Sequence, residues 1–291
     1  MNVDDGSSDS LFGSDVSQDE KTDQHSASHQ GVPTASRLAP SISGMFFFPD
    51  LMPRHLHNKV LEQVSACDYF ALDDGTEGAT AIKGRNKTAR CEAQDRSPRN
   101  QAMLFARSIP SGRDAQDNVY GLQDELQGCS GLPGWAVELI QRLEELLTSL
   151  PEPQLPHNVR QLIFPANQLL SRQLIINLYT GMEGLASHVD LVHRFADGIV
   201  LCSFGPQNTG TVMEFTHAKG SHPPCHLFLP SGSVLLLSGE ARYDWKHGIS
   251  ARKFDLVRSA TCPEEIDEVR RSIRLSITIR SMLPGADVVG G

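Results

Sequence analysis

The sequence predicts an α+β protein that is mainly β, a double-stranded β-helix (jelly roll) with flanking helices. Two observations predict this fold. Short apolar runs separated by Gly and Pro turns follow one another after Pro156, a pattern typical of sandwiches and barrels. Before that point, apolar residues recur at helical spacing. With 291 residues, the chain is long enough for one or two domains.

Two helices are expected in the first half of the chain, over residues 53–64 and 133–147. In each, apolar side chains repeat every three or four residues and therefore share one face, which packs on a core. The apolar positions are Leu56, Val60, Leu61 and Val64 for the first helix, and Leu139, Ile140, Leu143, Leu146, Leu147 and Leu150 for the second.

Strands are expected in the second half, bounded by turn residues. Short apolar runs occupy residues 174–176, 199–201, 211–215, 226–229 and 234–237. A further segment, 274–280, alternates strictly between polar and apolar residues. Period two places Arg274, Ser276, Thr278 and Arg280 on one face and the apolar residues on the other. In an ordinary half-buried strand, such a polar face looks into solvent.

Composition separates the two ends of the chain from its middle. Residues 1–40 hold seven acidic and two basic residues among many Ser and Gln. Such a segment buries too little apolar surface to offset its ordering entropy, so we expect a disordered acidic tail. We expect residues 45–170 to form a helical part, residues 171–284 a β-core, and residues 285–291 a flexible C-terminus.

The charge pattern allows a nucleic-acid partner although the net charge is −9. The acidic tail accounts for −5 of that sum, and residues 83–113 hold eight basic residues against two acidic ones. A local positive excess is a candidate surface for phosphate contacts. The candidate contacts are Lys83, Arg85, Lys87, Arg90, Arg96 and Arg99. The alternative is a flexible, solvated loop.

Cysteine usage and apolar stretches bear on the compartment. The six cysteines are scattered, without a C-x-x-C motif, which indicates a reduced compartment. No apolar stretch is long enough for a signal peptide or a membrane span. We therefore expect a cytoplasmic or nuclear protein without a membrane partner.

Three residues have the chemistry of an open metal site. His188 and Asp190 are two apart, so on an extended segment their side chains leave the same face and can converge on one ion. His247 would add a third ligand. Two imidazoles and one carboxylate leave open positions, which is diagnostic of non-haem Fe(II) oxygenases and not of closed zinc sites. Taken alone, the His-x-Asp pair is also expected by chance, because the chain has eleven histidines.

Four motifs follow one another in the second half of the chain. They are Asn177-x-Tyr179, His188-x-Asp190, His247-Gly248-Ile249 and Arg274-x-Ser276-x-Thr278-x-Arg280. Together they resemble the AlkB family of nucleic-acid dealkylating dioxygenases, over residues 45–284 and most densely from residue 172 onward. Residues 239–249 and the run Arg252-Lys253-Phe254-Asp255 are most similar to the dioxygenase domain of the tRNA-modifying AlkB homologue of animals and plants.

The resemblance implies Fe(II) as the metal, with 2-oxoglutarate and dioxygen as co-substrates. It assigns the catalytic iron to His188, Asp190 and His247. It assigns the distal carboxylate of 2-oxoglutarate to Arg274 with Tyr179, the chelating end to Arg280 with Asn177, and a further contact to Ser276. Arginine suits this task because its planar guanidinium grips a carboxylate bidentately. On an ideal strand, however, Arg274 and Arg280 would lie roughly 20 Å apart.

Two positions depart from the family pattern. Ser276 stands where the family usually has Asn, and Val192 stands where the bacterial enzyme has an acidic residue. The implied architecture is a Fe(II)/2-oxoglutarate dioxygenase β-core over residues 171–284, with a nucleotide-recognition lid in residues 45–170. The implied activity is oxidative dealkylation or hydroxylation of a modified base in RNA or DNA.

Two other functions remain open from the sequence. One is oxidation of a protein side chain, and the other is a catalytically silent nucleic-acid-binding module. We expect a monomer. If tRNA is the substrate, the chain would need a partner protein or a different way of holding the tRNA.

Overall fold

The computed structural model describes residues 31–70, 100–107, 128–262 and 264–286. Its helices are α1 (Arg54–Ser65), α3 (Gly134–Thr148), α4 (His157–Ile163) and α5 (Gly239–Tyr243). Its strands are β1 (Thr34–Ala35), β2 (Met45–Phe48), β3 (Gln101–Phe105), β4 (Arg172–Tyr179), β5 (Leu185–His188), β6 (Ile199–Phe204), β7 (Gly210–His217), β8 (Cys225–Pro230), β9 (Val234–Leu237), β10 (Trp245–Ile249), β11 (Phe254–Arg258), β12 (Ile266–Arg270) and β13 (Arg274–Ser281).

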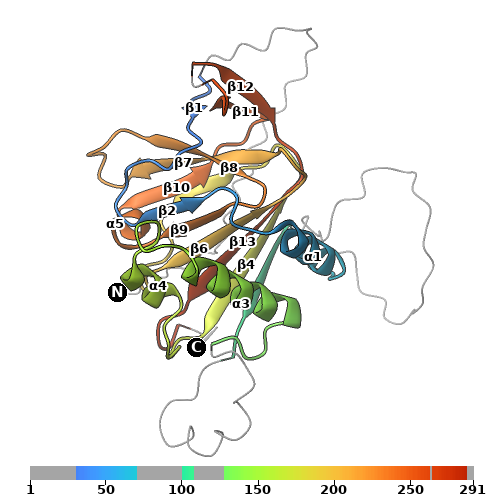
Figure 1. Cartoon of the computed structure of the whole chain (residues 1–291), viewed down its shortest axis with the longest axis vertical. Coiled ribbons are helices and arrows are strands. Elements are labelled where there is room, and N and C mark those ends of the chain that lie inside the picture. The colour runs from blue at the N-terminus through green and yellow to red at the C-terminus, as the bar shows by residue number, and fades with distance from the viewer. Residues whose placement is uncertain (1–30, 71–99, 108–127, 263, 287–291) are drawn as a thin grey trace, which may run out of the picture.

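Two antiparallel sheets form the body of the molecule (Figure 1). The larger sheet has the order β2-β9-β6-β13-β4-β3, and the smaller sheet has the order β5-β10-β7-β8. Buried side chains from both sheets share one apolar cluster, which includes Ile199, Met213, Phe215 and Leu237. The predicted jelly roll is therefore confirmed. A third sheet, β1-β11-β12, lies beyond β7 and β8 at the top of Figure 1.

Helices α1, α3 and α4 cover the other face of the larger sheet (Figure 1). Val60 of α1 and Leu139 of α3 belong to the same buried cluster as Leu174 of β4 and Ile277 of β13. Both predicted helices are confirmed within one or two residues at each end. Each begins directly after a proline. Proline is tolerated there because the first N–H groups of a helix have no acceptor within the helix, so its missing N–H costs no hydrogen bond. No helix in the described ranges is long and apolar enough to cross a membrane.

Strand β13 is buried on both faces. Leu275, Ile277 and Ile279 pack beneath the helices. The opposite face carries Arg274 and Arg280, which are only 8% and 7% exposed. The solvent-facing arrangement of an ordinary strand does not hold here, because the smaller sheet covers this polar face. The polar residues of β13 consequently line the inside of the jelly roll.

The N-terminal part contributes strands as well as helices. β2 forms one edge of the larger sheet beside β9, and β3 forms the opposite edge beside β4. Within the segment expected to be a disordered tail, Thr34 and Ala35 pair with β11. Such pairing satisfies backbone groups that an open sheet edge leaves free. Residues 1–30 of that tail, and the basic residues 83–99, lie outside the described ranges.

Candidate active site

The smaller sheet brings the predicted metal ligands together. β5 and β10 are neighbours, and His188 is directly opposite His247 in their register. Asp190 follows two residues after His188, just beyond the end of β5. One ligand-type atom from each of these three residues lies within 4.8 Å of the other two.

Gly248 permits the close approach of β5 to β10. A Cβ atom at this position would lie 2.8 Å from the Cα and 2.9 Å from the backbone N of Ser187. These are backbone atoms of the strand that carries His188, so they cannot move aside without displacing the ligand. The absent side chain lets the imidazoles of His188 and His247 approach to a centroid distance of 4.5 Å.

Local contacts orient the ligand atoms. His188 Nδ1 lies 2.8 Å from the carbonyl oxygen of Ala186. Because a carbonyl only accepts, Nδ1 is the donor in this contact, and Nε2 is the nitrogen left for a metal. Asp190 Oδ1 accepts a hydrogen bond from Arg280 Nη1, whereas Asp190 Oδ2 lies 3.6 Å from His247 Nε2. One carboxylate oxygen therefore remains beside the two imidazoles.

Burial and charge set the protonation states of two of these groups. Burial lowers the pKa of His247 to about 4, against an opposing effect of Asp190. Burial alone would raise the pKa of Asp190, but His247 and Arg280 bring that pKa below its ordinary value. At neutral pH the pair is thus a neutral imidazole and an anionic carboxylate, the forms that bind a divalent metal.

A second cationic group lies in the same pocket. Arg274 donates from Nη2 to Ser203 Oγ at 2.8 Å, and its guanidinium stands over the Tyr179 ring at 5.3 Å. Its Nε and Nη1 atoms are buried and have no hydrogen-bond partner among the described residues. A buried guanidinium with two unpaired donor atoms can donate a charge-assisted hydrogen bond to a ligand carboxylate.

All five residues predicted to bind the co-substrate line one pocket with the three metal-site residues. Register places Tyr179 of β4 opposite Arg274, and Asn177 opposite Ser276. Asn177 Oδ1 accepts a hydrogen bond from Gln101 Nε2 at 2.8 Å. The two arginines lie near opposite ends of this strand pair. Arg280 is already bonded to Asp190, whereas Arg274 retains donors without a partner among the described residues.

Sequence reasoning missed three polar side chains around the site. Gln173 Oε1 accepts from both Nε and Nη2 of Arg280, at 3.1 and 2.6 Å. The alternation of side chains along a strand could have placed Gln173 in the pocket, because Gln173 shares a face of β4 with Asn177. Ser203 and Arg242, which contact Arg274 and the backbone of Asp190, have no comparable local signal.

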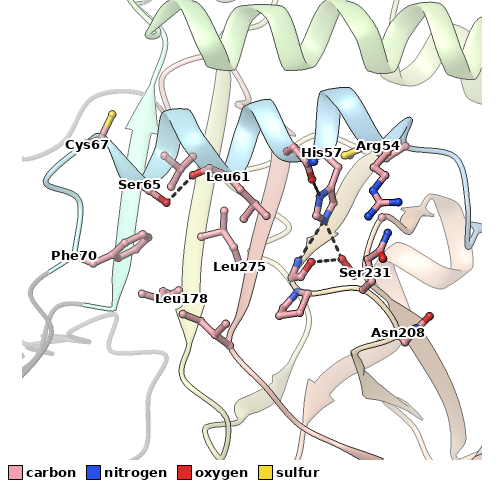
Figure 2. A pocket seen from close by; sticks show the side chains of 18 of the residues that line it. Arg54, His57, Leu61, Ser65, Cys67, Phe70, Leu178, Asn208, Ser231 and Leu275 are labelled. Atoms are coloured by element: carbon pink, nitrogen blue, oxygen red, sulfur yellow. Dashed lines mark hydrogen bonds between the residues drawn. The ribbon is translucent and has the colours of Figure 1, made fainter.

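A cavity of about 950 Å³ lies away from this site, between α1 and the ends of β4 and β13 (Figure 2). Figure 2 shows Leu61, Leu178 and Leu275 along its apolar part, and His57 bonded to Ser231 at the other end. None of the predicted metal or co-substrate residues lines it. We therefore place the chemistry in the smaller pocket inside the jelly roll.

The sequence matches the family described as the 2OG-Fe(II) oxygenase superfamily over residues 77–280. Among curated proteins, it is 38% identical over 119 residues to the tRNA (carboxymethyluridine(34)-5-O)-methyltransferase alkbh8 of Xenopus tropicalis. That match covers 38% of this chain and 18% of the other protein.

Two further relatives have shorter chains. Uncharacterized protein L905 of Acanthamoeba polyphaga mimivirus is 34% identical over 38% of this chain and 48% of its own length. The N6-methyladenosine RNA demethylase ALKBH of Cryphonectria parasitica is 29% identical over 40% of this chain and 54% of its own length. The resemblance to AlkB-like dioxygenases is thereby confirmed, although the chain spans only part of each relative.

Proposed function

Because the chain belongs to the 2OG-Fe(II) oxygenase superfamily, we propose that it oxidises a modified base in RNA or DNA, by dealkylation or by stable hydroxylation. It is a dioxygenase that depends on Fe(II) and 2-oxoglutarate. The observation that carries the proposal is the convergence of three metal-ligand side chains in one pocket with a buried arginine that has unpaired donors.

The residues in the pocket fit both Fe(II) and 2-oxoglutarate. His188, Asp190 and His247 would hold Fe(II), through two imidazoles and the oxygen of Asp190 that Arg280 leaves free. Arg274 would donate to the distal carboxylate of 2-oxoglutarate through one of its unpaired buried donors. When bound, Fe(II) activates dioxygen for hydroxylation of a C–H bond while 2-oxoglutarate becomes succinate and carbon dioxide.

The outcome of hydroxylation depends on which carbon reaches the pocket. A hydroxymethyl group on nitrogen breaks down to formaldehyde and leaves a demethylated base, whereas a hydroxyl on a carbon-bound position stays. Positioning of the substrate decides between them. Two supports favour a nucleic acid: relatives whose names refer to tRNA and RNA, and the basic segment over residues 83–99.

A competition between substrates tests the proposal. The protein is loaded anaerobically with Fe(II) and 2-oxoglutarate and then exposed to oxygen with tRNA, mRNA, alkylated DNA and a peptide mixture. Mass spectrometry should find an altered nucleoside and stoichiometric succinate, and both should vanish for Asp190→Ala. Oxidation confined to the peptides would refute a nucleic-acid substrate. Unchanged succinate formation by Asp190→Ala would refute the metal assignment.

A further inference from the structure

Arg242 is a buried arginine whose hydrogen-bond partners are backbone carbonyls. It lies on α5 and is only 2% exposed. Its Nη1 donates to the carbonyl oxygen of Asp190 at 2.9 Å. Its Nη2 makes longer contacts, of 3.5 Å, to the carbonyl oxygens of Leu191 and Phe195. One guanidinium thus spans the backbone that leads away from a predicted metal ligand.

The helix that carries Arg242 is tied to the same loop. At its first residue, the backbone N–H of Gly239 donates to both carboxylate oxygens of Asp197, at 3.0 and 3.1 Å. The loop from Asp190 to Asp197 is therefore attached to α5 near both of its ends. Because β10 begins two residues after α5, the same short helix also precedes the strand that carries His247.

Two arginines consequently hold Asp190, one at its side chain and the other at its backbone. Arg280 of β13 donates to its carboxylate, and Arg242 of α5 donates to its main-chain carbonyl. Burying a guanidinium carries a desolvation cost, and replacing buried charges with well-packed apolar groups is often neutral or stabilising. The burial of Arg242 is therefore weak evidence for a role in net stability, whereas its hydrogen bond to the Asp190 carbonyl fixes the position of a predicted ligand.

We propose that Arg242 is a positioning residue for the metal site, which fixes the backbone of Asp190 before the metal binds. This inference rests on the proposed function, because it requires Asp190 to be a ligand. Groups that orient ligands in this way typically contribute about 10- to 100-fold to metal affinity, as their removal shows. Arg242 itself touches neither metal nor substrate in this scheme.

Co(II) binding to the full chain tests the proposal without turnover, by titration of the metal's visible absorption under anaerobic conditions. Arg242→Met should weaken Co(II) binding by about 10- to 100-fold. The matched control is Arg172→Met, which removes an arginine that is 5% exposed and donates to the Ile163 carbonyl on the helix side of the larger sheet. That variant should keep wild-type Co(II) affinity, whatever its effect on thermal stability.

Equal Co(II) affinities for Arg242→Met and wild type would overturn the proposal. If Arg242→Met does not fold, Arg242→Lys decides, because a single ammonium nitrogen cannot span the three carbonyls that the guanidinium contacts. Its affinity should lie below that of wild type while Arg172→Lys shows no change, and an unchanged affinity for Arg242→Lys would again overturn the role. Asp190→Ala is measured in parallel. Wild-type Co(II) binding by that variant would refute the metal assignment itself, and Arg242's role with it.

Discussion

Replacing Arg274 by lysine isolates the geometry of the guanidinium from its charge. Arg274 has two buried donor atoms, Nε and Nη1, without a partner among the described residues, and lysine can supply only one point donor in their place. A hydrogen bond to a charged group contributes about 1.5–3 kcal/mol. Losing one charge-assisted hydrogen bond to the distal carboxylate should cost about 2 kcal/mol, which is about a 30-fold change in affinity.

Initial rates of succinate formation at varied 2-oxoglutarate concentrations measure this effect. We expect the KM for 2-oxoglutarate to rise about 30-fold and kcat to change much less, because the same bond forms in the ground state and the transition state. Arg172→Lys is the control, since Arg172 is also buried but bonds to Ile163 on the other side of the sheet. An unchanged KM for Arg274→Lys would refute the reasoning and place the distal carboxylate elsewhere.

Two further predictions concern β10 and the basic segment. Gly248→Ala should weaken Co(II) binding by about tenfold or more, because the added methyl group would displace the strand that carries His188. The control is Gly134→Ala, whose methyl group meets nothing within 4 Å and should leave Co(II) binding unchanged. Equal effects of the two substitutions would contradict the role given to Gly248. Replacing Arg85, Lys87 and Arg90 by Gln should weaken oligonucleotide binding in fluorescence titrations equally across sequences. The salt slope should fall by about 0.9 for each phosphate that the variant no longer neutralises, and identical slopes would rule out a role of these residues in phosphate binding.

Sequence reasoning located the strand faces well, because side-chain direction alternates strictly along a strand. Period two alone placed Arg274, Ser276 and Arg280 on a common face, and all three line the pocket. The i, i+2 spacing likewise predicted that His188 and Asp190 converge. These are local properties of the backbone, so they can be predicted without knowing what covers the strand.

What covers the strand could not be predicted in the same way. The pattern of β13 is also that of a strand with one face in water, and only the opposing sheet makes its polar face an interior wall. The hydrogen bond from Arg242 to the Asp190 carbonyl joins residues 52 apart, and its acceptor is a backbone group that every residue has. The edge strands β2 and β3 likewise depend on the open edges of β9 and β4, which no local pattern specifies.

The charges inside the jelly roll explain why the site favours being filled. Arg280 pairs with Asp190, which leaves Arg274 with unpaired buried donors and no carboxylate bonded to it among the described residues. An uncompensated buried cation is costly, and a ligand that binds only the folded state stabilises it by mass action. A dianion accompanied by a divalent cation adds no net charge, yet in the proposed site it would place a carboxylate beside Arg274 and a cation beside Asp190. In the proposed site, the burial of Arg274 and Asp190 would thus give the co-substrate and metal together an advantage over either one alone.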